Sequence, residues 1–233
     1  QRAVIDGHTN FAIYTDGTGS VATMDQAASV SFLEMTNCSE GRIYRLAVQG
    51  HPGTYTRGMA FTGSANDHLA IWQVTADGVS SFAEWASSPD DSFLHVYQAN
   101  TVTGFTRYVV YIDAGHDFAC VGNDSNTDVA AAGEGHYRFQ GHYGQSGLGD
   151  PATTGQGVWM MGNRTRSTTT HSCFRHGWSD VAASFNSFEG VTSFGLSHNP
   201  QTVDHELQIN HRFEANYLAA LGWGYASSHV HLG

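Results

Sequence analysis

Short stretches in which apolar and polar residues alternate recur along the chain. Examples are FAIYTDG (11–17), ASVSFLEM (28–35), HLAIWQVTADG (68–78) and FTRYVVYIDAG (105–115). Most such stretches are bounded by Gly, Asn, Pro or an Asp-Gly pair. Alternation with period two is typical of half-buried strands, and regularly spaced turn residues are typical of sandwiches and barrels. The pattern therefore predicts an all-β fold, a sandwich or a barrel.

One stretch near the end of the chain has a helical pattern instead. In VDHELQINHRFEANYLAALGWGY (203–225), Asp204 can cap a helix and Gly222 stands where a terminating glycine is preferred. Apolar residues from Phe213 onward are spaced roughly as on one helix face. We expect one short C-terminal helix against the sandwich. No linker and no internal repeat of fixed period divides the chain, so we expect a single domain over residues 1–233.

Composition narrows the range of partners. Charged residues make up 13% of the 233 residues, there is no lysine, and the formal net charge is -11. This charge repels phosphate backbones, which excludes nucleic acid as the expected partner. No apolar run approaches the roughly 18 residues of a membrane-spanning helix. The chain begins at Gln1 rather than Met, from which we expect a removed leader and a secreted, extracellular protein.

Histidine pairs raise the question of metal chemistry. His205-Glu206 resembles the start of a zinc metalloprotease motif, but the next histidine is His211. On a helix, residues six apart point to different faces, so this pair cannot grip one ion. In HSCFRH, His171 and Cys173 would share a strand face that His176 does not. A strand carrying a buried or disulfide-bonded cysteine is the simpler interpretation.

The segment DSNTD offers a candidate cation site. Asp124, Asn126 and Asp128 alternate along the chain as oxygen ligands do in calcium loops, although Val129 stands where an EF-hand requires glycine. We predict a calcium site here, in a long Gly-rich loop over residues 122–135; a solvated turn is the alternative.

Two covalent modifications are also expected for a secreted chain. Asn37, Asn123 and Asn163 stand in N-x-S/T triplets within polar, turn-rich stretches, which predicts exposed glycosylation acceptors. One disulfide among Cys38, Cys120 and Cys173 would leave one thiol over, and three reduced cysteines are the alternative.

Catalytic motifs do not assemble in the sequence. We find no GxSxG elbow, phosphate-binding loop or CxxC pair, and nothing groups two of the carboxylates that glycosidase chemistry needs. We therefore predict no catalytic residues and favour a protein that is not an enzyme.

Four motifs in the second half of the chain resemble a known family. They are YVVYIDAG (108–115), GVWMMGNR (157–164), GWSDVAASFN (177–186) and FEANYLAALGWGY (213–225). Their order is similar to that of the concanavalin A-like, laminin-G-like jelly rolls of bacterial and phage surface proteins, over about residues 90 to 225. The resemblance implies an antiparallel jelly roll whose relatives bind glycans or other proteins, often with calcium.

Taken together, these patterns predict an extracellular, non-catalytic recognition module that binds a glycan or surface polymer. Aromatic side chains stack on sugar rings, and Asn and Asp side chains bind hydroxyl groups. A structural subunit of an appendage, sheath or virion, which would self-associate, is the alternative. A second, weaker alternative is a polysaccharide-cleaving enzyme on the same fold.

Overall fold

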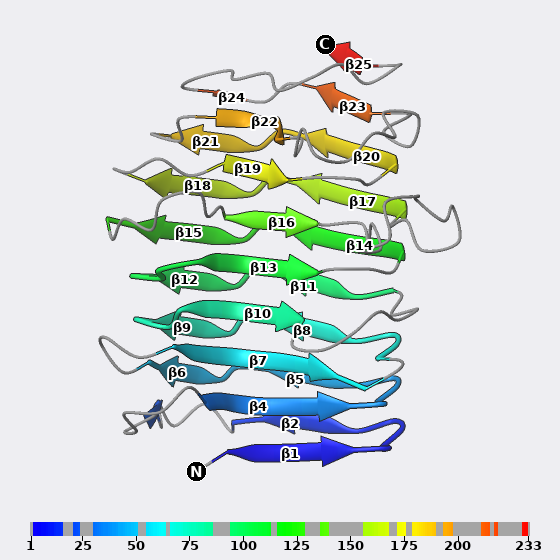
Figure 1. Ribbon diagram of the computed structural model, residues 1–233, viewed down its shortest axis with the longest axis vertical. Helices are drawn as coiled ribbons and strands as arrows, with labels where there is room; N and C mark the ends of the chain where they lie inside the picture. The colour runs from blue at the N-terminus through cyan, green and yellow to red at the C-terminus, as the bar shows by residue number, and fades with distance from the viewer. Residues whose placement is uncertain are drawn as a thin grey trace, which may run out of the picture.

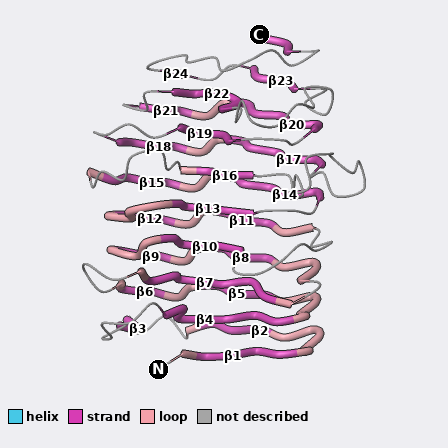
Figure 2. The backbone as a smooth tube through the Cα atoms, viewed as in Figure 1, coloured by secondary structure: helices cyan, strands magenta, loops and turns pink. Residues whose placement is uncertain are grey.

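The chain winds into a parallel β-solenoid, in which three sheets form the sides and each coil contributes strands to them (Figures 1 and 2). In this computed structural model the described residues are 2–15, 21–23, 30–50, 55–63, 66–85, 94–112, 116–128, 136–139, 156–167, 172–175, 179–189, 193–197, 211–214, 217–218 and 230–232. The coils stack from the N-terminus at one end to the C-terminus at the other.

The strands fall into three long sheets and one short pair. Sheet 1 comprises β1 (Ala3–Asp6), β4 (Val30–Thr36), β7 (Thr56–Thr62), β10 (Ser81–Trp85), β13 (Tyr108–Ile112) and β16 (Tyr137–Phe139). Sheet 2 comprises β2 (Ala12–Tyr14), β5 (Arg42–Tyr44), β8 (Ala70–Trp72), β11 (Val96–Gln98), β14 (His116–Val121), β17 (Gln156–Met161), β20 (Ser179–Ser184), β23 (His211–Glu214) and β25 (Val230–Leu232). Sheet 3 comprises β3 (Val21–Thr23), β6 (Ala47–Gln49), β9 (Thr75–Asp77), β12 (Thr101–Thr103), β15 (Asp124–Thr127), β18 (Arg164–Ser167), β21 (Ser187–Glu189) and β24 (Tyr217–Leu218). β19 (Ser172–Arg175) pairs with β22 (Ser193–Ser197).

The prediction of an antiparallel jelly-roll sandwich is wrong, and so is the resemblance on which it partly rested. Every strand pairing of the described residues is parallel, as in the neighbours β5 and β8 or β14 and β17. Short strands, alternation and frequent turn residues are common to both architectures. What differs is the pairing partner, which in the solenoid lies one whole coil away.

The predicted C-terminal helix is also wrong where the structure describes it. His211–Glu214 form β23 and Tyr217–Leu218 form β24, both with parallel partners. At the corners of the solenoid, the spacing between inward-facing apolar residues changes from two to three, and this spacing resembles that of a helix face. Ile43, Leu46 and Val48 all point into the core, with one three-residue step across the corner and one two-residue step along the strand.

Single residues with left-handed backbone conformation make these corners. Between sheets 1 and 2 they include Asn10, Glu40, His68 and Leu94, with φ from 52 to 56°. This conformation costs about 1–2 kcal/mol for a non-glycine residue. Corner hydrogen bonds offset that cost: the N–H of Asn10 donates to Ser39 O at 3.0 Å, and that of Glu40 to Asp67 O at 3.1 Å.

The core fills the inside of the solenoid. One apolar cluster runs through the coils, and its largest side chains include Phe61, Phe82, Tyr97, Phe105 and Phe118, all fully buried. Because the inward positions are occupied in this way, any binding surface must lie on the outer faces of the sheets or at their corners. Among the described residues, no helix is long and apolar enough to cross a membrane.

Candidate functional site

Aromatic side chains form a ladder on the outer face of sheet 2. Tyr14, Tyr44 and Trp72 occupy the same position in the consecutive strands β2, β5 and β8. Tyr14 and Tyr44 stack with ring centroids 4.9 Å apart, and Tyr44 and Trp72 with centroids 4.5 Å apart; both pairs are tilted by only 7°. Tyr14 is 58% exposed. Parallel strands in register place identical positions one strand spacing apart, which produces this stack.

The ladder presents ring edges to solvent, because its rings cover each other's faces. Only the outer faces of the two end rings, Tyr14 and Trp72, lack another described ring against them. The expectation that aromatic faces are offered to sugar rings therefore holds at the ends of the ladder alone. Along its length, the edges offer the positive rim of the aromatic quadrupole, which favours contact with oxygen atoms.

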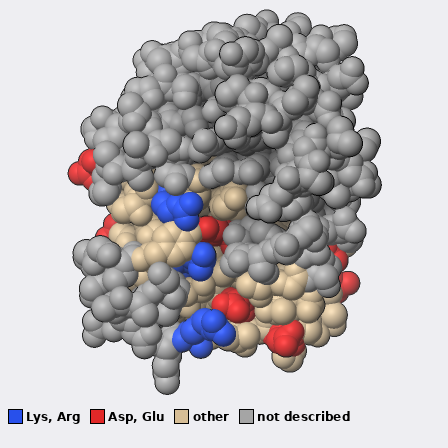
Figure 3. Space-filling view, viewed as in Figure 1, with Lys and Arg blue, Asp and Glu red and all other residues tan. Residues whose placement is uncertain are grey.

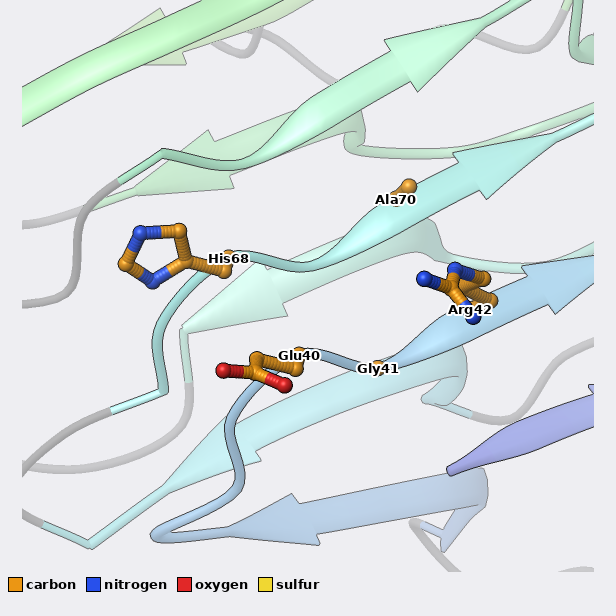
Figure 4. Close-up of a pocket in the computed structure, with 5 residues that line it drawn as sticks. All are labelled: Glu40, Gly41, Arg42, His68 and Ala70. Atoms are coloured by element: carbon orange, nitrogen blue, oxygen red, sulfur yellow. The ribbon is translucent and has the colours of Figure 1, made fainter. Parts of the chain in front are cut away.

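A shallow depression of about 270 Å³ lies beside the ladder (Figure 4). It is lined by Glu40, Gly41, Arg42, His68 and Ala70. Glu40 and His68 stand at equivalent corners of consecutive coils, and Arg42 and Ala70 lie farther along β5 and β8. The side chains of Glu40, Arg42 and His68 are exposed.

The depression combines hydrogen-bond donors and acceptors at one place. The guanidinium of Arg42 is a donor only, the carboxylate of Glu40 is an acceptor, and the imidazole of His68 can be either. Glu40 and Arg42, which are two residues apart in the sequence, carry opposite charges. Such a set suits hydroxyl groups, which both donate and accept. This site could not be predicted from the sequence, because its members come from different coils.

A second cluster is buried on the outer face of sheet 1, where basic and acidic side chains gather (Figure 3). The Glu84 carboxylate accepts a hydrogen bond from the Tyr55 hydroxyl, which in turn accepts one from Arg107. Arg57 Nε and Arg107 Nη1 each lie 3.5 Å from a Glu84 oxygen. Burial, together with the neighbouring Glu84 charge, raises the pKa of Tyr55 to about 12.

This cluster is a clamp between coils. Glu84 lies on β10, Arg57 on β7 and Arg107 just before β13, and both guanidinium groups lie over the Tyr55 ring, at 4.5 and 4.9 Å. The Glu84 side chain is only 4% exposed. A ligand in solvent has no direct access to it, so we assign it to stability.

Two carboxylates on sheet 1 bear on the enzymatic alternative. Glu34 and Glu84 are in the same row, separated by Ala60 on the strand between them. Two strand spacings correspond to about 10 Å, near the separation found in inverting glycosidases. However, Glu34 pairs with Arg2 at 3.1 Å, Glu84 is enclosed by two arginines, and Ala60 between them is fully buried. Both carboxylates of this row are therefore engaged in ion pairs, Glu34 in one and Glu84 in two.

The predicted calcium ligands lie in a strand, not in a loop. Asp124 and Asn126 belong to β15, and Asp128 follows directly. All three point outward along extended backbone, and Asp124 pairs with Arg166 at 2.8 Å. Extended alternation spreads these oxygen atoms along the strand rather than converging them. In the described part of the chain, no three His, Cys, Asp or Glu side chains are grouped as a metal site; calcium binding itself stays a prediction.

Two of the three predicted glycosylation acceptors belong to a buried asparagine ladder. Asn123 and Asn163 are 2% and 1% exposed. The Asn123 amide donates to Tyr97 O at 2.9 Å and to Asn163 Oδ1 at 2.9 Å. Asn163 continues the row by donating to Asn186 Oδ1 at 2.9 Å. A glycan on either residue is incompatible with these bonds. Asn37 is exposed, and its glycosylation stays a prediction.

The predicted disulfide is wrong. Cys38 and Cys120 are free thiols, both buried. Every possible pair among the three cysteines would include Cys38 or Cys120. Cys38 instead donates from its sulfur to Ile5 O and Thr36 O at 3.3 Å. Cys38 and Cys120 are therefore core residues.

Three histidines considered as ligands, His171, His176 and His205, lie outside the described residues. His211 starts β23. A histidine that the sequence did not single out is fully buried: His95 contacts Tyr97 Oη through Nδ1 at 3.1 Å and the Asn66 carbonyl through Nε2. Burial lowers its pKa from 6.5 to about 4. It is a neutral core residue at pH 7.

Comparison with known proteins identifies no family. No protein-family model matches the sequence, and no curated protein matches it either. Among solved structures, the chain is similar to the catalytic unit of a thermostable GH87 α-1,3-glucanase from Streptomyces thermodiastaticus, with 10% identity and a TM-score of 0.32. The match covers 91% of this chain and 53% of the glucanase chain, so this chain spans about half the length of the glucanase unit. Similarity at this level supports no functional argument, and function has to be argued from the outer faces described above.

Proposed function

We propose that the protein is an extracellular, non-catalytic module that binds a polysaccharide through the outer face of sheet 2. The observation that carries the proposal is the aromatic ladder of exposed Tyr14 and half-buried Tyr44 and Trp72, beside a depression lined by Glu40, Arg42 and His68. Carbohydrate sites combine apolar or aromatic surface with a few convergent polar groups.

Charge supports a neutral ligand. The protein carries a formal net charge of -11, which disfavours the approach of polyanions such as nucleic acids. Within the depression, Glu40 and Arg42 carry opposite charges, so neither sign of ligand charge is favoured. Hydroxyl groups interact with both side chains without requiring a net charge.

The test is a screen of the purified protein on a glycan array, followed by titration of the best ligand with variants. Trp72→Ala removes an end ring of the ladder and should weaken binding about tenfold, which corresponds to about 1.4 kcal/mol. Phe185→Ala is the matched control, because Phe185 is 69% exposed but lies several coils away. Absence of binding to every glycan, or equal affinity of the Trp72→Ala variant and the wild type, would contradict the proposal. Repeating the titration with a chelator tests whether calcium contributes.

A structural subunit is the second candidate, and one observation favours it. Trp159, Met161 and Phe185 are 53%, 51% and 69% exposed on adjacent coils. Clustered exposed apolar side chains often mark interfaces. Light scattering at increasing concentration distinguishes the two: a protein that stays monomeric at high concentration is not a self-assembling subunit.

A further inference from the structure

We propose that the ligand is a linear, neutral polysaccharide that runs parallel to the solenoid axis, along a trough that starts at β2 and ends at Trp159. This inference rests on the proposed function and adds the orientation, the length and the chemical class of the ligand.

The floor of the trough is a row of mostly small side chains on sheet 2. The first outward position of consecutive strands is occupied by Ala12, Arg42, Ala70, Val96 and Ala119. The next member of the row is Trp159, which pairs with Ala119 and is 53% exposed. A large side chain thus follows a run in which Arg42 is the only long one, and it forms an end wall.

The two sides of the trough differ in chemistry. Two residues farther along each strand stand Tyr14, Tyr44, Trp72 and then Gln98, which pairs with Trp72. On the opposite side are the left-handed corner residues, among them Asn10, Glu40 and His68. One side is therefore aromatic over β2, β5 and β8, and the other side is polar over the same three coils, whereas the next corner residue, Leu94, is apolar. Sugar hydroxyl oxygens can contact the aromatic edges on one side, and hydroxyls can hydrogen-bond to the polar corner residues on the other, while the free faces of the end rings, Tyr14 and Trp72, suit the apolar C–H groups of a sugar.

Dimensions favour a ligand along the axis over one across it. Neighbouring strands are about 4.8 Å apart, so the row from β2 to β14 extends over about 19 Å. Across the sheet, the aromatic row and the floor row are two residues apart, which is about 7 Å. A polymer lying along the trough meets the same positions in successive coils, whereas one lying across it meets only one or two coils.

The experiment is a calorimetric length series with neutral linear oligosaccharides: cello-, xylo-, malto- and laminari-oligosaccharides from disaccharide to octasaccharide. In the series that binds, affinity should rise with length until the extended oligosaccharide reaches about 19 Å and then level off. Trp159→Ala removes the end wall, so affinity should continue to rise for longer members.

A blocking variant tests the path of the ligand. Val96 lies half-exposed in the floor, outside the core, so Val96→Trp should fill the trough midway. It should weaken the longest oligosaccharides at least about tenfold and change disaccharide affinity little. Ala182→Trp is the matched control, because Ala182 pairs with Trp159 in the same row but lies beyond the end wall; it should have no effect.

Failure of this inference is distinct from failure of the proposed function. Affinity that does not depend on length, or equal effects of Val96→Trp and Ala182→Trp, would overturn the axial trough while leaving glycan binding intact. If no oligosaccharide and no array glycan binds, the proposed function and the trough fail together.

Discussion

Truncation of Asn163 to alanine should destabilise the solenoid strongly. Its side chain makes four buried hydrogen bonds: it accepts from Asn123 N at 3.0 Å and Asn123 Nδ2 at 2.9 Å, and donates to Cys120 O at 2.8 Å and Asn186 Oδ1 at 2.9 Å. Asn163→Ala removes the acceptor of the buried Asn123 N–H and a donor to the Cys120 carbonyl. An unsatisfied buried group costs about 1–3 kcal/mol, so we expect a loss of about 3 kcal/mol.

The assay is equilibrium unfolding in urea, followed by circular dichroism, with Asn126→Ala as the matched control. Asn126 lies exposed on β15, and its side chain has no hydrogen bond to a described residue; the control should change the free energy of unfolding by less than about 0.5 kcal/mol. If the free energy of unfolding depends less steeply on urea concentration in the variant than in the wild type, the coils unfold in stages, as repeat proteins can. Equal losses for the two variants would refute the argument that the ladder stabilises the coils.

Three further predictions concern the core. Burial lowers the pKa of His95 from 6.5 to about 4, so between these two pH values unfolding is accompanied by uptake of a proton on His95. The stability that neutral His95 contributes is therefore fully present above pH 6.5 and is lost as the pH falls towards 4. Urea titrations should show the free energy of unfolding decrease by about 3 kcal/mol over this range. A flat profile over this range would contradict it, and His95→Gln should remove this part of the dependence. Thiol titration in denaturant without reductant should count three thiols, whereas in the folded protein Cys120 should stay unreactive, because burial raises its pKa; fewer than three would restore the disulfide. Gly58→Ala would place a Cβ 2.7 Å from the Phe82 carbonyl oxygen and should lower stability by about 1–3 kcal/mol; an unchanged urea midpoint would show that the strands separate easily.

The strands and corners could be predicted from local sequence, because they depend on nearby residues. Alternation in AIY, RIY and AIW indicates β2, β5 and β8 correctly. The direction of pairing could not be predicted in this way, since the same short strands serve antiparallel sandwiches. Coils of unequal length hid the repeat: Val96 pairs with Ala119, but Ala119 pairs with the much more distant Trp159.

One signal of the solenoid was visible in the sequence. QANT, VGND, MGNR and SFNS each place an asparagine directly before a strand of sheet 3, and these are the ladder residues Asn100, Asn123, Asn163 and Asn186. Two of them were interpreted as glycosylation sites, because a sequon is defined by its own three residues. An asparagine that recurs in each coil between a strand of sheet 2 and the next strand of sheet 3 is the pattern that indicates an internal ladder.

The candidate site was harder to predict, because stacking creates it. Tyr14, Tyr44 and Trp72 are far apart in the sequence and come together only through the register of β2, β5 and β8. Glu40 and His68 meet in the same way at the corners. A prediction of glycan binding from aromatic content alone therefore could not name the residues.

A crystal structure of the protein with the tightest-binding neutral oligosaccharide tests the account most directly. We expect sugar units on the outer face of sheet 2, between the ladder of Tyr14, Tyr44 and Trp72 and the corner residues Glu40 and His68, with the chain parallel to the solenoid axis. Sugar density on sheet 1 or sheet 3, with the outer face of sheet 2 open to solvent and empty, would contradict it.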